Sequence, residues 1–87
     1  MRITAFLWDE ANVGHVAKHG VVPEEAEQAL SRAPQVRRAR LDRYAAIGTT
    51  EEGRFLVIVF RALGGGVVRV ITARDATPRE KRAHGTK

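Results

Sequence analysis

Apolar and polar positions near the N-terminus predict one short strand and two helices. Residues 3–8 form a short apolar stretch that predicts a first strand. Asp9 is a good N-cap for a first helix, and Gly20 stands where a left-handed C-cap would end it. Pro23 then starts a second helix, residues 24–31, in which apolar positions recur at helical spacing behind an acidic first turn.

The second half of the chain has the pattern of three antiparallel strands in series. Residues 44–48 predict a short strand, and a turn at residues 50–53 follows it. Residues 55–60 are apolar at every position, which is typical of a central strand buried on both faces. Three glycines at 64–66 predict a hairpin loop before the next strand, residues 67–73.

A basic helix is predicted to close the chain. Thr77 is a good N-cap, Pro78 suits the first helical position, and Glu80 completes a capping box. The element order is therefore β-α-α-β-β-β-α. This order predicts an α+β fold in which helices pack on one face of a small antiparallel sheet, as a single domain over residues 1–87.

Composition and charge narrow the class of protein. Hydrophobic residues make up 44% and charged residues 29% of the 87 residues, as in an ordinary globular domain. Cysteine is absent, which excludes disulfides and thiolate metal sites and fits a cytoplasmic location. Residues 1–31 carry two basic and five acidic residues, which gives a net charge of −3. Residues 32–87 carry 13 basic and five acidic residues, which gives a net charge of +8. The basic part is suited to RNA, DNA or an acidic protein.

No apolar run is long enough to cross a membrane, and the N-terminus does not have the pattern of a signal peptide.

The first helix carries a cluster of basic side chains at its end. His15 and His19 are four residues apart, and Lys18 stands between them. A histidine pair at this spacing can bind zinc, but no third ligand is well placed. The imidazoles can instead be structural, or Lys18 and His19 can act on a phosphate as a cation and a general acid or base.

Arginines interrupt the apolar pattern of the strands. Arg61 shares a face with the odd-numbered residues of its strand, and Arg74 points opposite to Arg69 unless a bulge intervenes. Arg74 is the best candidate for a phosphate ligand, because its strand ends just before a helix N-terminus. Alternatively, each arginine forms an ion pair with an acidic neighbour, the candidates being Asp9, Glu10 and Asp75.

Two further basic segments are candidate binding surfaces. Between the second helix and the next strand lie Arg32, Arg37, Arg38, Arg40 and Arg43. This segment can follow a nucleic-acid backbone, receive an acidic partner, or be a solvated loop. The last helix adds phosphate-binding candidates Arg79 and Arg82, and His84 can reach the sheet as a proton-transfer group.

Three motifs in sequence resemble one known family. They are Trp8-Asp9-Glu10, then Lys18-His19-Gly20-Val21 with Pro23-Glu24-Glu25, then Arg69-Val70-Ile71-Thr72-Ala73-Arg74-Asp75 with Thr77-x-x-Glu80. In this order and spacing the chain resembles the BrnT-like toxins of bacterial type II toxin–antitoxin systems, which are small ribonucleases with a RelE/ParE-like fold.

The resemblance implies a toxin that cleaves RNA, inhibits translation and is neutralised by a cognate ribbon-helix-helix antitoxin in a hetero-oligomer. By position it points to Lys18, His19, Arg69 and Arg74, whereas Glu80 is better explained by the capping box. We therefore expect a metal-independent endoribonuclease without cofactors, in which a ribose 2′-OH attacks the adjacent phosphate, and the ribosome is a candidate partner. The alternative is a non-catalytic module of the same fold that binds nucleic acid or the antitoxin.

Overall fold

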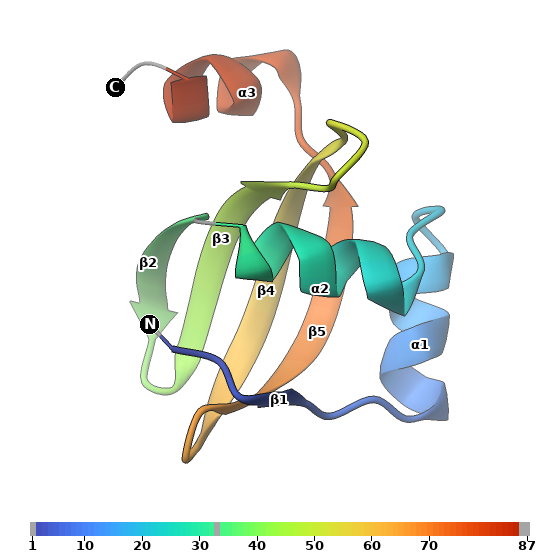
Figure 1. Cartoon of the computed structure of the whole chain (residues 1–87), viewed down its shortest axis with the longest axis vertical. Helices are drawn as coiled ribbons and strands as arrows, with labels where there is room; N and C mark the ends of the chain where they lie inside the picture. Colours follow the sequence, from blue (N-terminus) through green and yellow to red (C-terminus); the bar gives the residue numbers. More distant parts are fainter. Residues whose placement is uncertain (1, 33, 86–87) are drawn as a thin grey trace.

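A computed structural model describes residues 2–32 and 34–85 of the chain, arranged as one sheet with three helices (Figure 1). The elements in chain order are β1 (Ala5–Phe6), α1 (Glu10–Ala17), α2 (Pro23–Ser31), β2 (Gln35–Arg40), β3 (Arg43–Thr49), β4 (Phe55–Gly64), β5 (Val67–Asp75) and α3 (Pro78–Gly85). The predicted α+β class is confirmed. No helix in the described part of the chain is long and apolar enough to span a membrane.

The sheet has five strands in the order β1-β5-β4-β3-β2. Strands β2 to β5 pair antiparallel, and β4 is central, as its apolar sequence predicted. The prediction of a purely antiparallel sheet was wrong, because β1 pairs parallel to β5 through Ala5 with Val67 and Phe6 with Val68. The chain passes both helices and three strands before it returns to β1, and no local pattern in the sequence reports such a pairing.

Strand β2 was missed by the sequence analysis, so the element order is β-α-α-β-β-β-β-α. Residues 35–40 belong to the segment interpreted as a basic stretch between a helix and a strand. They pair with β3 from Gln35 opposite Ile47 to Arg40 opposite Arg43. An edge strand with exposed arginines lacks the apolar alternation that identifies a half-buried strand, so only its pairing with β3 reveals it.

One face of the sheet is covered by α2 and the N-terminal segment, while α1 lies along the edge of β5 (Figure 1). Leu56, Ile58 and Phe60 of β4 are fully buried against this layer. Helix α2 approaches the sheet closely at Gly48, where a side-chain carbon would collide with the backbone carbonyl of Ala29. The helices were predicted on one face, and α2 occupies that position.

The predicted helix ends are confirmed by their capping bonds. The Asp9 carboxylate accepts hydrogen bonds from the Ala11 and Asn12 backbone amides. In return, the Asp9 backbone amide donates a hydrogen bond to the Asn12 side-chain oxygen. Gly20 has a φ of +71°, as a left-handed C-cap requires. Helix α3 begins with the predicted box, in which the Thr77 amide donates to Glu80 and the Glu80 amide donates to Thr77.

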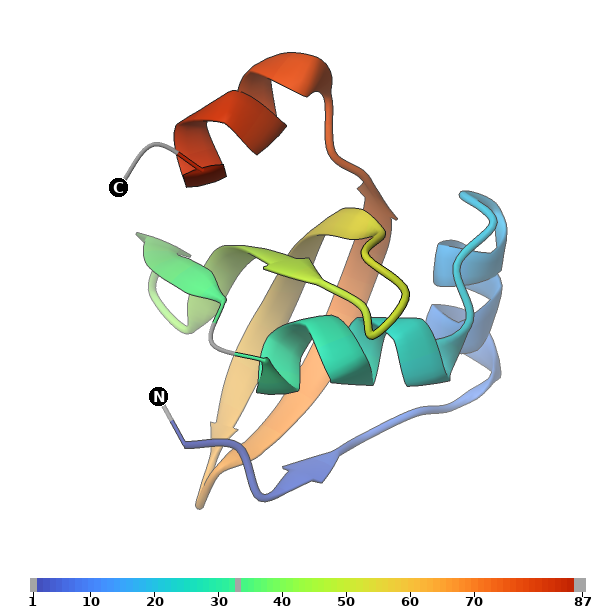
Figure 2. The same cartoon turned by 45° about the horizontal axis from the view of Figure 1, so that its top comes forward.

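The opposite face of the sheet is open over much of its area. Helix α3 follows β5 and stands over the end of the sheet, apart from the layer of α1 and α2 (Figure 2). Residues of β4 on this face, such as Val57 and Val59, are half-buried rather than buried. This open face carries the arginines that the sequence analysis singled out.

Candidate functional site

A β-bulge in β5 brings three arginines to the open face. Arg69 lies opposite Arg61 in the register, and Arg74 lies opposite Val57. The register shifts between them, which leaves Ile71 without a partner in β4. One extra residue reverses the alternation, so Arg69 and Arg74 point to the same side. The bulge that the sequence analysis named as the exception is present.

Two of these arginines form ion pairs with carboxylates at the end of the open face that lies away from α3. Arg69 donates to both oxygens of Asp9, at 2.6 and 3.2 Å, and Arg61 donates twice to Asp42, at 2.9 and 3.1 Å. The hydrogen bond from Arg69, with the Asn12 amide, lowers the pKa of Asp9 to about 2. Arg69 therefore forms an ion pair with Asp9, one of the three acidic neighbours named as the alternative to a phosphate site, and both arginines are oriented by a carboxylate.

Arg74 is bound at the other end of the open face by the first turn of α3. Its two terminal nitrogens each donate to one oxygen of Glu80 at 2.9 Å, and Nη1 also donates to the Asp75 carbonyl at 3.1 Å. The guanidinium of Arg74 lowers the pKa of Glu80 to about 2, with help from the Thr77 amide. Glu80 thus joins the capping box to the candidate phosphate ligand, which the sequence analysis had treated separately. Three of the five N–H donors of Arg74 are used, so two remain for a ligand.

A groove of about 500 Å³ opens between α3 and the sheet beside Arg74. Its apolar floor is formed by side chains of β3 and β4, and its polar walls come from β2 and α3. The lining residues are Gln35, Val36, Arg37, Ala45, Ala46, Ile47, Val57, Arg79, Glu80 and Ala83. The groove therefore combines an apolar floor with one arginine from β2 and one from α3.

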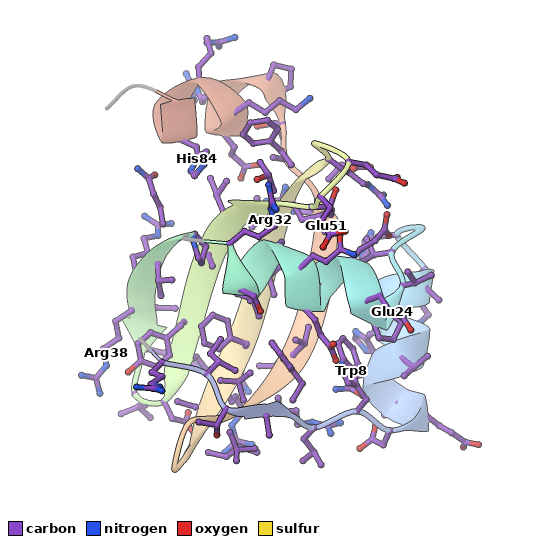
Figure 3. The ribbon with its side chains drawn as sticks, viewed as in Figure 1. Trp8, Glu24, Arg32, Arg38, Glu51 and His84 are labelled. Atoms are coloured by element: carbon purple, nitrogen blue, oxygen red, sulfur yellow. The ribbon has the colours of Figure 1, made fainter. Side chains whose placement is uncertain are left out.

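His84 points from α3 towards the end of the sheet (Figure 3). Its ring meets Phe55 edge-on at 5.6 Å between centroids, and the Lys81 ammonium lies 5.9 Å from the centre of the same phenyl ring. The Nδ1 atom of His84 is buried and has no hydrogen-bond partner among the described residues. His84 therefore reaches β4 through its contact with Phe55, and its role as a proton-transfer group stays a prediction.

The Lys18–His19 pair lies in a different place from the α3 groove. Helix α1 ends at Ala17, Lys18 is its C-cap, and His19 lies in the exposed turn that follows. His15 is also exposed. The turn adjoins the end of β5 through Arg54, whose guanidinium donates to the backbone carbonyls of His19 and Gly20.

Arg54 is an organising residue that the sequence analysis missed. It donates to both oxygens of Asp75 at 2.7 and 3.2 Å and to Glu25 at 2.9 Å. These bonds raise the pKa of Arg54 and lower that of Asp75. Asp75 follows Arg74 directly, so Arg54 ties the turn after α1 to the strand end that carries the candidate site. Its position after the glycine of a turn gave no signal of this role.

The remaining candidates lie on α3. Arg79 is exposed and lines the groove, and Arg82 is exposed on the same helix. Together with Arg74, Glu80 and His84 they form the α3 cluster, which unites two arginines of the helix with the end of β5. The structure thus gathers the predicted site residues into three groups: the α3 cluster, the Arg61–Arg69 pair and the Lys18–His19 turn.

Comparison with known proteins identifies the family of this chain. Residues 8–80 match the family model described as the ribonuclease toxin, BrnT, of type II toxin–antitoxin systems. This chain belongs to the BrnT toxin family. The family span begins at Trp8 and ends at Glu80, so it includes every element from the N-cap of α1 to the first turn of α3.

A solved structure supports the family assignment. The crystal structure of the Brucella abortus ribonuclease toxin, BrnT, matches the chain with a TM-score of 0.68 and 29% sequence identity. The match covers 84% of this chain and 96% of the Brucella chain. No curated protein matches the chain significantly. The resemblance seen in the sequence motifs is confirmed, and the fold is that of a BrnT toxin; the wider RelE/ParE relationship stays a prediction.

Proposed function

We propose that this chain, as a single domain over residues 1–87, is a metal-independent endoribonuclease toxin that needs no cofactor. It cleaves RNA in the cytoplasm, including RNA on the ribosome, and thereby inhibits translation. A cognate ribbon-helix-helix antitoxin neutralises it in a hetero-oligomer. Membership of a family of ribonuclease toxins supports the activity, and the arginines gathered on the open face support an RNA substrate.

The RNA backbone would lie along the open face and enter the groove under α3. Arg61 and Arg69 hold one end of this path, and Arg74 and Arg79 hold the other. Arg82 extends the basic surface along α3. Carboxylate partners fix the guanidinium groups of Arg61, Arg69 and Arg74 before RNA binds, which lowers the entropy lost on binding. The half-buried apolar floor is suited to the flat faces of unpaired bases.

The α3 cluster supplies one proton-transfer group and the cations for this reaction. A base removes the proton of the ribose 2′-OH, the 2′ oxygen attacks phosphorus, and the bond to the 5′ oxygen breaks as an acid protonates it. The products are a 2′,3′-cyclic phosphate and a free 5′-OH. His84 transfers a proton, and the two free donors of Arg74 stabilise charge on the phosphoryl oxygens.

Lys18 and His19 would provide a second cation and a second proton-transfer group. The turn that carries them is tied to Asp75 through Arg54, next to Arg74. An RNA that bends over the end of β5 would therefore meet both the α3 cluster and this turn. Orientation of the 2′-OH in line with the leaving oxygen, rather than a strong nucleophile, would supply much of the rate.

The common placement of Arg69 and Arg74 on one face is the observation that carries this site assignment. The test is induced expression in a bacterial host of wild type, Arg74→Ala and Arg74→Lys, followed by growth curves and a gel of total RNA. We expect arrest and RNA loss for wild type, neither for Arg74→Ala, and weak cleavage for Arg74→Lys, which keeps charge but loses the planar fork.

Purified protein separates activity from folding. Arg74→Ala should retain a wild-type circular dichroism spectrum and antitoxin binding, because its side chain is half-exposed and outside the buried core. Full RNA cleavage by this variant would contradict the site. Normal growth and intact RNA with soluble wild-type protein would instead support the non-catalytic module.

A further inference from the structure

The outer edge of β2 is a strand edge with free pairing capacity. In the described part of the chain β2 pairs with β3 on one side only and is the last strand of the sheet. Its pairing is regular from Gln35 to Arg38, and the register shifts between Arg38 and Arg40. An edge of this kind presents backbone N–H and C=O groups that another extended chain can pair with.

The edge is strongly basic, and its charges are not neutralised within the chain. Among the described residues, Arg37, Arg38 and Arg40 make no ion pair, whereas Arg61, Arg69 and Arg74 of β4 and β5 each have a carboxylate partner. Arg38 projects outward from β2, as Figure 3 shows, and its Nε donates to the carbonyl of Leu41 at 2.8 Å. Pairing of two copies of this chain through β2 would add further arginine–arginine neighbours to those already present across β2 to β5, so the edge is better suited to an acidic partner.

Exposed apolar side chains accompany these charges. Leu41, at the tip of the β2–β3 hairpin, is 78% exposed, and Val36 is 38% exposed. Leu41 also has a φ of +48°, a backbone conformation that a leucine adopts only at a cost. A glycine or asparagine would serve the turn better, so the leucine is better explained by a contact that its side chain makes with a partner.

We infer that the edge of β2 binds an extended acidic segment of the antitoxin, which adds to the sheet as a sixth strand and covers Leu41. The inference rests on the antitoxin partnership proposed above. RNA is the less suitable occupant, because its backbone lacks the regularly spaced N–H donors that an extended peptide offers to the free carbonyls of the edge, and because it gains nothing from an exposed leucine. Arg38 shares its sheet face with Tyr44 and the covered side, away from the RNA groove.

The test measures binding of the antitoxin encoded beside the toxin gene to four forms of the full chain by isothermal titration calorimetry. They are wild type, Arg38→Glu/Arg40→Glu, Leu41→Asn, and the control Arg2→Glu/Lys81→Glu, which makes the same charge change at exposed positions outside β2 and its flanking basic segment. We expect a loss of roughly tenfold to thirtyfold for the edge double variant and no change for the control.

Leu41→Asn tests the apolar contact without damage to the turn. Asparagine tolerates a positive φ, so the melting temperature should stay the same or rise while affinity falls several-fold. Hydrogen exchange gives the geometry: amides of residues 36–38 should gain protection in the complex if a strand is added, and should not if only side chains dock.

Each outcome decides between the proposals. Equal antitoxin affinity for all four forms would overturn the edge inference and leave the toxin proposal intact. No binding by wild type would overturn the antitoxin partnership and the inference with it. If Arg38→Glu/Arg40→Glu binds antitoxin normally but loses affinity for a uridine dodecamer, the edge serves RNA and the inference is wrong.

Discussion

The two faces of the sheet are made from the same strands but differ in what they do. On the covered face, alternate residues of β4 are fully buried in the apolar core, and α2 approaches the sheet backbone closely at Gly48. On the open face, the intervening residues are half-buried, and arginines from β4 and β5 stand at both ends. Folding free energy therefore comes mainly from one face, and the other is free to carry charge for binding.

The largest expected difference between the two faces is in the stability lost when two adjacent residues of β4, one on each face, are truncated. Phe60 is fully buried and stacks on Tyr44 with ring centroids 5.6 Å apart, whereas Val59 lies on the open face. Phe60→Ala should lower the free energy of unfolding by about 3–5 kcal/mol and Val59→Ala by about 1 kcal/mol, measured by urea denaturation. If Phe60→Ala does not fold, Phe60→Leu gives the same ranking, and equal losses at the two positions would refute the comparison.

A glycine pair tests the closeness of the covered layer. Gly48→Ala places a methyl group against the Ala29 carbonyl of α2 and should cost roughly 1–3 kcal/mol or more of unfolding free energy. Gly14→Ala, in α1, meets nothing within 4 Å and should stabilise by up to about 1 kcal/mol. The check is thermal and urea denaturation of both variants; a neutral Gly48→Ala would mean that α2 shifts away without cost.

Arg54 is expected to have a structural role, whereas Arg61 is expected to have a role in binding. Arg54→Ala removes bonds to Asp75, Glu25 and two backbone carbonyls, so it should destabilise by about 1–2 kcal/mol. Arg61→Ala removes one half-exposed pair and should cost below about 1 kcal/mol while weakening RNA binding. Urea midpoints and the affinity for a uridine dodecamer measure the two effects, and the reverse order of stabilities would contradict them.

The smallest expected effect is a loss of stability in acid. Arg74 and the Thr77 amide lower the pKa of Glu80 from 4.5 to about 2 in the folded protein. The folded state therefore binds fewer protons than the unfolded state in this range, and the stabilisation present above pH 4.5 is lost as pH falls towards 2. The midpoint of urea denaturation should fall over this window, and less steeply for Glu80→Gln. An identical pH profile for this variant would exclude the contribution of Glu80.

Local chemistry allowed much of the fold to be predicted. The N-cap at Asp9, the left-handed Gly20, the start of α2 at Pro23 and the box at Thr77 each depend on a few neighbouring residues, and each was found where the sequence placed it. Central placement of β4 followed from its apolar sequence. These features need no knowledge of distant contacts, which explains why they could be predicted.

The remaining features depend on partners far away in the chain. The parallel pairing of β1 and the strand character of the arginine-rich β2 are decided by β5 and β3, not by their own sequences. The bulge at Ile71 is a property of the register with β4, and it changes which face Arg74 occupies. The role of Arg54 arises from three segments meeting in space. The candidate site residues could therefore be named from the sequence, but their positions relative to one another could not be predicted.

The pairing of β1 with β5 has a consequence for how the protein is made. Ala5 must find Val67, and the Asn12 side chain must find the Val70 carbonyl, across most of the chain. During synthesis β1 therefore has no strand partner until β5 has left the ribosome, and contacts of such long sequence separation form slowly. The open face is completed in the same late step, because β5 carries Arg69 and Arg74. The basic open face of this chain therefore forms only after the ribosome has finished synthesising β5.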